Sequence, residues 1–172
     1  MLLCGGWRVI VRTLTLVGGL TGAVTSSQFP EFSQQYMQRL GGAVDALGEV
    51  VADFDASAAA SDLTREAALA QLQGTAFLDS RRADMRRTIT RYTQLTADLA
   101  VLEGEGPFMR AYHAGRFTDP EIAQAAWEVY QPAVPVNFAG LTFAGVGFVL
   151  GGLAMGLLLG LVRMPFRRRR TA

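Results

Sequence analysis

Charged residues are absent from a long stretch near the C-terminal end of the chain. From Val129 to Val162, 34 consecutive residues carry no formal charge, and Ala139–Val162 consists almost entirely of Ala, Gly, Val, Leu and Phe. About 20 apolar residues in a helix cross the hydrocarbon core of a bilayer, whereas a soluble helix of this length normally shows a polar face. The pattern predicts a transmembrane helix and disfavours the alternative, a buried core helix.

A second uncharged stretch lies near the N-terminus, at Thr13–Pro30, and Val9–Val24 is mostly apolar. Two interpretations fit it. One is a membrane span that is retained; the other is a signal peptide, with Arg8 and Arg12 as its basic start. A cleavage site prefers small residues, and Thr25 is β-branched, so the retained span is the preferred prediction.

Amphipathic helical patterns fill the segment between these stretches. Apolar residues recur every three or four positions over about 30–59 and again over 77–102, where Gly104 and Pro107 predict a stop. A short helix is expected in LTREAALAQLQ, and Asp119-Pro120-Glu121 is a strong helix start. Strand patterns are nearly absent, and the two long patterns suit an antiparallel helical hairpin.

The predicted fold is therefore an all-α membrane protein, with two transmembrane helices flanking a periplasmic helical hairpin and short extra helices. Residues 1–28 form the first span with a short cytoplasmic N-terminus. Residues 29–134 form the helical domain, and residues 135–172 form the second span with a basic cytoplasmic tail.

The charge distribution predicts the orientation. All 16 basic residues are arginine; nine lie between Arg39 and Arg116, and all 15 acids lie between Glu31 and Glu128, so the middle has net charge −6 and the flanks +7. Basic residues gather at the cytoplasmic ends of spans. Both termini are expected in the cytoplasm of a bacterial inner membrane, with the middle in the periplasm. The tail RMPFRRRR is interpreted as a topology anchor; contact with anionic headgroups is the alternative.

Two sets of charges border the apolar faces of the long helices. They are Asp45, Glu49 and Asp53 on the first helix and Arg82, Arg86, Arg87 and Arg91 on the second. Either they pair across the hairpin or both faces are solvated, and exposed pairs add little stability. Arg81 falls on the apolar face of the second helix, where it snorkels, pairs with an acid, or marks a contact site.

Residues for catalysis are scarce. The chain has one cysteine, Cys4, and one histidine, His113, and it lacks metal-binding, nucleotide-binding and nucleophile-elbow motifs. Neither span holds an internal acid or histidine, so a proton or ion relay has no support. We expect no enzyme activity, no cofactor, no metal and no nucleic-acid partner. Membrane lipids, and a membrane protein or a second copy, are the expected partners.

Glycines in the two spans are the best candidates for function. They stand four apart at Gly18–Gly22 in the first span and at Gly147–Gly151 and Gly152–Gly156–Gly160 in the second. Small residues at this spacing let helix backbones approach closely in lipid. The alternative is the general enrichment of glycine in spans, and the pattern leaves the identity of the packing partner open.

The stretch after the first span has the features of a membrane exit. Phe29, Phe32 and Tyr36 are expected near the interface, and Pro30 suits the start of a new helix. Gly41 and Gly42 each cost a helix roughly 1 kcal/mol, which close approach of another helix would offset. We expect this exit segment to lie at the membrane surface.

A family resemblance covers nearly the whole chain and is most specific in this exit segment. The matching residues are Ser27, Gln28, Phe29, Pro30, Glu31 and Phe32, followed by Gln34, Gln35, Tyr36, Gln38, Arg39, Leu40, Gly41, Gly42, Ala43, Asp45 and Leu47. They resemble a bacterial family of two-span membrane proteins, the domain-of-unknown-function (DUF) family 2937. The resemblance implies the two-span layout and no catalytic residue.

The expected function is that of a non-catalytic inner-membrane accessory, scaffold or assembly protein that packs against partner membrane helices. The alternative is a homo-oligomeric pore or transport component built on the glycine-rich second span. Ion flux through liposomes would favour the pore, and a stable foreign partner would favour the accessory role.

Overall fold

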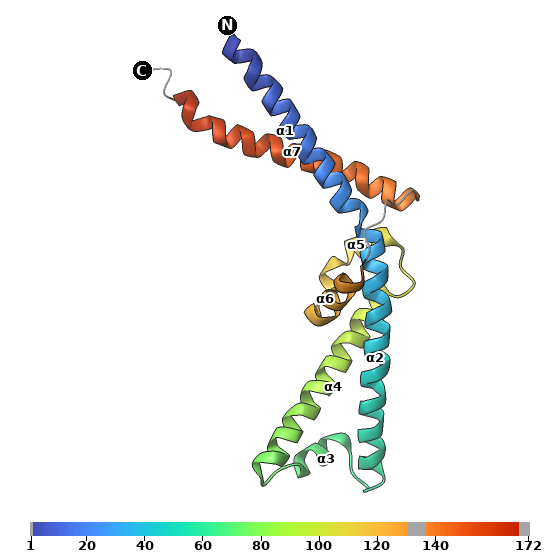
Figure 1. Cartoon of the computed structure of the whole chain (residues 1–172). Helices are drawn as coiled ribbons and strands as arrows, with labels where there is room; N and C mark the ends of the chain where they lie inside the picture. The colour runs from blue at the N-terminus through green and yellow to red at the C-terminus, as the bar shows by residue number, and fades with distance from the viewer. Residues whose placement is uncertain (1, 131–136, 169–172) are drawn as a thin grey trace. The chain divides into compact units, whose positions relative to one another are not determined.

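The computed structural model describes residues 2–130 and 137–168, and every regular element within these ranges is helical (Figure 1). The all-helical prediction is thereby confirmed. The elements are α1 (Leu2–Ser27), α2 (Phe29–Ala59), α3 (Arg65–Gln71), α4 (Ala76–Leu102), α5 (Pro107–Tyr112), the 3₁₀ turn η1 (Ala114–Arg116), α6 (Pro120–Val129) and α7 (Phe138–Arg168).

The chain divides into two compact units. The terminal unit comprises Met1–Phe32 and Gln131–Ala172, and the central unit comprises Ser33–Tyr130. The predicted boundary at residues 134 and 135 lies outside the described residues, as do residues 169–172 of the basic tail.

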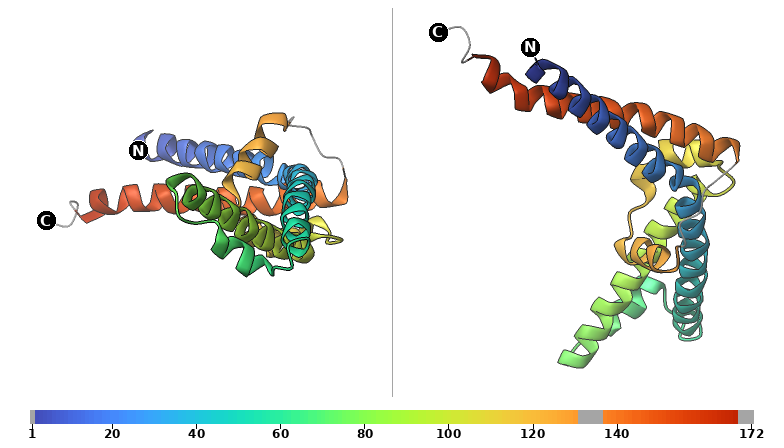
Figure 2. Two further views of the ribbon diagram at one scale, coloured as in Figure 1. Left: turned by 90° about the horizontal axis from the view of Figure 1, so that it is seen from below. Right: turned by 45° about the horizontal axis from the view of Figure 1, so that its top comes forward.

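In the terminal unit, α1 and α7 pack against each other in antiparallel directions. Figure 2 shows the N-terminal end of α1 and the C-terminal end of α7 at the same end of the pair. The runs Trp7–Ala59 and Phe138–Val162 each contain a stretch long and apolar enough to cross a membrane, of which only 11% and 6% is buried. The core helix of a soluble protein would be mostly buried, so their exposure favours a lipid environment.

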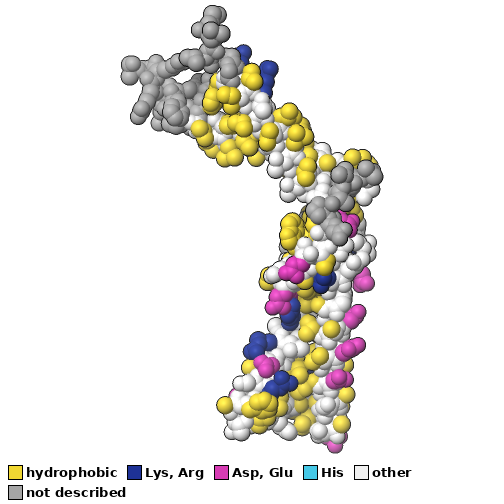
Figure 3. All heavy atoms as spheres, in the orientation of Figure 1, with side chains coloured by type: hydrophobic (Ala, Val, Ile, Leu, Met, Phe, Trp, Pro, Cys, Tyr) yellow, Lys and Arg dark blue, Asp and Glu magenta, His cyan; other side chains and the backbone are white. Residues whose placement is uncertain are grey.

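In the coloured part of α1 and α7 that Figure 3 shows, apolar side chains predominate and basic side chains lie near one end, whereas acidic and basic side chains are spread over α2 and α4. The start of α7 is capped by Asn137, whose Oδ1 accepts a hydrogen bond from the backbone N–H of Gly140 at 2.7 Å. This bond satisfies one of the N–H groups that the first turn of a helix leaves without an intrahelical partner.

The passage from α1 to α2 takes only Gln28. The Ser27 hydroxyl donates to the Val24 carbonyl at 2.9 Å, and the Gln28 carbonyl accepts from Phe32 N–H at 3.0 Å. Pro30 occupies the first turn of α2, where its missing N–H breaks no helical hydrogen bond. Proline is therefore tolerated at this junction.

In the central unit, α2 and α4 run in opposite directions (Figure 1). They meet at Gly48, where an added Cβ atom would lie 3.3 Å from the Tyr92 ring. The side chains of Thr64 and Thr75 cap the N-terminal ends of α3 and α4. Gly104, two residues after the end of α4, has a positive φ of +75°. Phe77, expected on the apolar stripe of the second long helix, is instead 72% exposed.

The core of the central unit comes mainly from the first half of α2, the second half of α4 and α6. Its largest fully buried side chains include Tyr36, Leu40, Leu95 and Leu102. The rings of Tyr36 and Phe117 lie 4.5 Å apart between centroids. The aromatic contact fixes the segment after η1 against α2.

Candidate functional site

Four glycines make the closest contact between α1 and α7. A Cβ atom on Gly22 would overlap the carbonyl oxygen of Gly147, and one on Gly147 would overlap the carbonyl oxygen of Gly22. The same conflict would arise between Gly151 and the carbonyl oxygen of Gly18. Because backbone atoms occupy the space, no side chain can be accommodated at Gly22, Gly147 or Gly151 without separating the helices.

The remaining glycines of the predicted packing set lie outside this contact. A Cβ atom on Gly152 would lie 3.8 Å from Thr15, an ordinary van der Waals distance, and Gly156 and Gly160 have nothing within 4 Å of that position. The series Gly152–Gly156–Gly160 of α7 therefore meets α1 only at Gly152, by an ordinary contact, and its face at Gly156 and Gly160 is open within the described structure.

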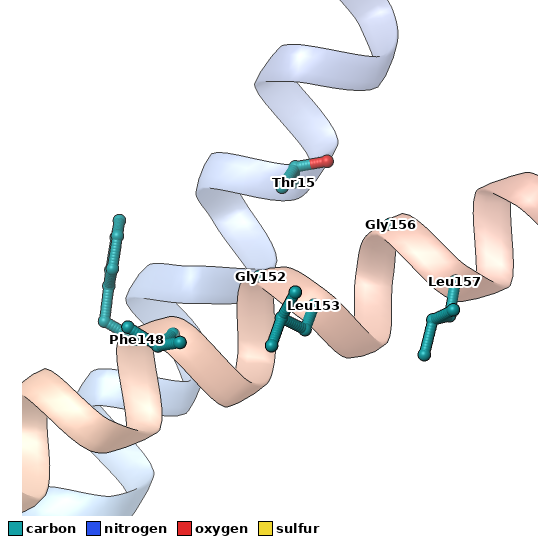
Figure 4. Close-up of a pocket in the computed structure, with 7 residues that line it drawn as sticks. Thr15, Phe148, Gly152, Leu153, Gly156 and Leu157 are labelled. Atoms are coloured by element: carbon teal, nitrogen blue, oxygen red, sulfur yellow. The ribbon is translucent and has the colours of Figure 1, made fainter.

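An apolar groove of about 480 Å³ lies on this open face, where α1 diverges from α7 (Figure 4). Thr15 of α1 lies on one side of it, and the other lining residues come from α7: Phe148, Val149, Gly152, Leu153, Gly156 and Leu157. A neighbouring hollow of about 310 Å³ shares Thr15, Phe148 and Gly152. Such a surface suits the side chains of another helix or lipid acyl chains, and it offers no group for acid–base chemistry.

The predicted membrane-exit residues fall into two environments. The Phe29 ring packs on Phe143 of α7 with centroids 5.4 Å apart, within the terminal unit. Pro30 and Phe32 belong to the same unit at the start of α2. Tyr36, in contrast, is fully buried in the core of the central unit. There its ring packs on Phe117, and its depth relative to the membrane stays a prediction.

Gly41 and Gly42 are not approached by another part of the described structure. A Cβ atom on either would meet nothing within 4 Å. The expected close approach of a helix is therefore not made within the described residues, and nothing in the structure explains the glycine pair.

A buried carboxylate, Asp98, organises the polar part of the central unit. It is completely buried on α4 and accepts hydrogen bonds from the Thr118 hydroxyl at 2.7 Å, Gln94 Nε2 at 3.1 Å and Arg116 Nη1 at 3.4 Å. A buried charge is tolerated only when it is paired and hydrogen-bonded. Asp98 therefore holds the segment around Thr118 against α4.

Asp119 joins three elements next to this cluster. Its Oδ1 accepts from the backbone N–H groups of Glu121 and Ile122 at 3.0 Å, capping α6, and its Oδ2 accepts from Arg91 Nε at 2.9 Å. The Asp119 N–H donates to the Tyr36 hydroxyl at 3.4 Å. Asp119 thereby links α6 to both α4 and α2.

Burial raises the pKa of the Tyr36 hydroxyl above its usual 10.0. The hydrogen bond from the Asp119 N–H lowers this pKa, the negative charges of Asp119 and Asp98 raise it, and the pKa is raised overall. Burial lowers the pKa of Arg91, but Asp119 and Glu121 outweigh it, so the pKa of Arg91 is raised overall. Both side chains keep their neutral-pH protonation states in this cluster. The cluster is built to hold the fold rather than to exchange protons.

A second hollow, of about 560 Å³, lies in the central unit between α4 and the start of α6. It is lined by Arg86, Arg87, Thr90, Arg91, Gln94, Leu95, Thr118, Asp119 and Pro120. Arg91 pairs with Asp119 and Glu121, and Arg87 pairs with Asp84. These acids offset much of the positive charge, so the hollow is a weak candidate for an anion site.

The arginines at the start of α4 form ion pairs with acids of the same helix. Arg82 pairs with Asp79 at 2.9 Å on its own helix, and among the described residues no ion pair joins the arginines of α4 to Asp45, Glu49 or Asp53. Arg81 is 56% exposed and lies 3.8 Å from Asp84, so of its three interpretations the structure shows pairing with an acid.

Asp98 and Asn137 were missed as structural residues by sequence reasoning. Asp98 looks like one of many solvated helix acids, since its partners Arg116 and Thr118 lie 18 and 20 positions away. Asn137 could have been found as a polar residue directly before an apolar helix, a usual capping position.

Comparison with known proteins gives one match, and it covers most of the chain. No curated protein and no solved structure matches it. A family model described as "Protein of unknown function (DUF2937)" matches residues 10–168, which include α1 from Ile10 onward, the whole central unit and α7. The chain therefore belongs to the DUF2937 family.

Proposed function

We propose that this protein is a non-catalytic accessory or scaffold protein of the bacterial inner membrane, and that it packs against a partner membrane helix. In this proposal α1 and α7 cross the bilayer, both termini lie in the cytoplasm and the central unit lies in the periplasm. The low burial of the apolar stretches and the net charges of the flanks and middle support the arrangement.

The observation that carries the proposal is the open groove beside Gly152 and Gly156. Helices associate in lipid mainly through close van der Waals packing, since lipid tails are as apolar as leucine. The contact with α1 uses Gly147 and Gly151 and leaves Gly156 with nothing within 4 Å. A second helix that packs at this groove would approach the α7 backbone closely, as α1 does at its own contact.

The test replaces Gly156 with leucine in the full-length protein. The new side chain would fill open space within the chain, so the α1–α7 contact is expected to remain, while a helix in the groove would be pushed away. The matched control is Gly145→Leu, because nothing lies within 4 Å of its Cβ position either and Gly145 does not line the groove. It is eleven residues, or about 16 Å, from Gly156 along α7.

Each variant is purified from membranes in mild detergent, and its bound proteins are identified by mass spectrometry. We expect a membrane protein that is recovered with the wild type and with Gly145→Leu and is lost with Gly156→Leu. Equal recovery with both variants would contradict a partner helix in the groove. Ion flux through liposomes holding the pure protein would instead favour a homo-oligomeric pore.

A further inference from the structure

The C-terminal end of α6 carries an exposed tryptophan, Trp127, that stacks on the half-buried ring of the C-cap residue Tyr130. Trp127 is 66% exposed and Val129 is 50% exposed, while Ile122 and Ala126 of the same helix are buried in the core. The rings of Trp127 and Tyr130 stack with centroids 5.6 Å apart and an interplanar angle of 22°. Stacking restricts the orientation of the two rings. Ile122 and Ala126 hold α6 against the core, so the position of the rings on the central unit is fixed.

We propose that this aromatic end of α6 (Trp127, Val129 and Tyr130) lies in the headgroup region of the bilayer and anchors the central unit to the lipid surface. The inference rests on the proposed membrane location of α7. In this proposal the aromatic end of α6 contacts lipid, and not a protein partner or a second copy of the chain.

The chemistry of the pair fits lipid headgroups. Tryptophan and tyrosine are enriched at membrane interfaces because each has an apolar ring with a polar group at its edge. In water an exposed tryptophan leaves a large apolar surface hydrated, which is unfavourable. In the headgroup region the exposed part of its ring meets acyl carbons instead of water.

Chain continuity limits the distance between the pair and the first residue of α7. Tyr130 precedes the start of α7 at Phe138 by eight residues, and an extended chain advances at most about 3.6 Å per residue, which limits the separation to less than about 30 Å. No charged residue occurs between Glu128 and Arg163. The uncharged run that includes α7 as far as Val162 therefore begins at the aromatic end of α6.

Tryptophan fluorescence tests the proposal, because the chain has only Trp7 and Trp127. In the full-length Trp7→Phe variant, all tryptophan emission comes from Trp127. The protein is reconstituted in phosphatidylcholine and phosphatidylglycerol vesicles, with or without lipids brominated at shallow or deep acyl positions. Acrylamide serves as the quencher in water.

We expect Trp127 emission to be blue-shifted relative to the unfolded protein and quenched more by shallow than by deep bromines. Emission typical of water, with no quenching by either lipid, would overturn the anchor. So would emission that is protected from acrylamide but not quenched by lipid, because a protein surface would then cover Trp127.

The Trp127→Phe variant separates this inference from the proposed membrane location. Its remaining tryptophan, Trp7, lies on α1. Quenching of Trp7 by brominated lipid with none of Trp127 would reject the anchor and keep the span. Absence of quenching for both would count against the membrane location itself and against the anchor that depends on it.

Discussion

Glycine carbonyls set the distance between α1 and α7, so a single side chain at this contact should separate the helices. We expect Gly22→Leu to abolish the close contact, since the space of its Cβ atom is already occupied by the carbonyl oxygen of Gly147. Gly160→Leu should leave it intact, because nothing lies within 4 Å of that position.

Disulfide formation reports this contact directly. Cysteines at Thr15 and Gly152, where the Thr15 methyl group lies 3.8 Å from the Gly152 Cβ position, are introduced with Cys4→Ser as background. The cross-link should form with Gly160→Leu and be lost with Gly22→Leu. Efficient cross-linking in the Gly22→Leu protein would show that the two helices do not meet through this glycine.

The buried carboxylate of Asp98 should be among the most sensitive residues of the central unit. Asp98→Ala removes the acceptor of the hydrogen bonds from Thr118, Gln94 and Arg116, and a typical hydrogen bond contributes about 0.5–1.5 kcal/mol. Asp98→Asn keeps an acceptor oxygen and should cost less. Thermal unfolding followed by circular dichroism in mild detergent measures the differences.

The control for Asp98 is Asp45→Ala on the exposed face of α2, where a surface substitution should change stability by less than about 0.5 kcal/mol. If Asp45→Ala and Asp98→Ala have equal effects, the buried cluster does not hold the segment around Thr118 as described.

Tyr36 gives the central unit a dependence on alkaline pH. Its folded pKa is raised above 10.0, chiefly by burial, so the unfolded chain loses this proton first as pH rises. The contribution of Tyr36 to stability is complete below pH 10 and declines between that value and the higher folded pKa. The melting temperature of the wild type should therefore fall faster above pH 10 than that of Tyr36→Phe. Parallel decline of the two proteins would exclude this assignment.

At the scale of the element, Asp119 combines a helix cap with an ion pair. A typical cap contributes about 1 kcal/mol, and Asp119 also holds Arg91 at 2.9 Å. We expect Asp119→Ala to cost about 2 kcal/mol, and Thr75→Ala, which removes one cap bond of 3.2 Å from α4, about 1 kcal/mol. Urea unfolding measures the free energy of unfolding of both variants. A larger loss of this free energy in Thr75→Ala than in Asp119→Ala would contradict the expected order.

Helix limits were largely predictable because local residues decide them. The expected helix over about 30–59 is α2 (Phe29–Ala59), and the pattern over 77–102 is α4 (Ala76–Leu102). Asp119-Pro120 starts α6 because a capping side chain and a fixed φ act within one turn. Residues that pair over longer sequence distances, such as Tyr36 with Phe117, could not be placed in this way.

The face of α7 that contacts α1 could not be predicted, for a different reason. The helix is apolar on all sides, so no polar stripe indicates which glycine series meets α1. Spacing alone favoured Gly147–Gly151 and Gly152–Gly156–Gly160 equally. The structure distinguishes them, since only the first pair opposes Gly18 and Gly22.

At the scale of the whole molecule, the charge asymmetry and the antiparallel helix pair both predict that the two termini lie on the same side of the membrane. Two antiparallel spans return the chain to the side from which it started, and basic residues favour the cytoplasmic side. The seven arginines of the flanks and the net charge of −6 in the middle predict the same sidedness. This agreement makes orientation the property of the whole chain that is easiest to test.

Two reporters test the orientation, one active only in the cytoplasm and one only in the periplasm. Fused after Arg170, only the cytoplasmic reporter should be active; inserted after Ala60, beyond the end of α2, only the periplasmic reporter should be active. Replacing Arg167–Arg170 with alanine should weaken the preference at the C-terminal site, because the charges that retain that end are removed. Periplasmic activity after Arg170 in the unaltered chain would reverse the orientation, and a mature N-terminus near Ser26 would show that the first apolar helix is a cleaved signal.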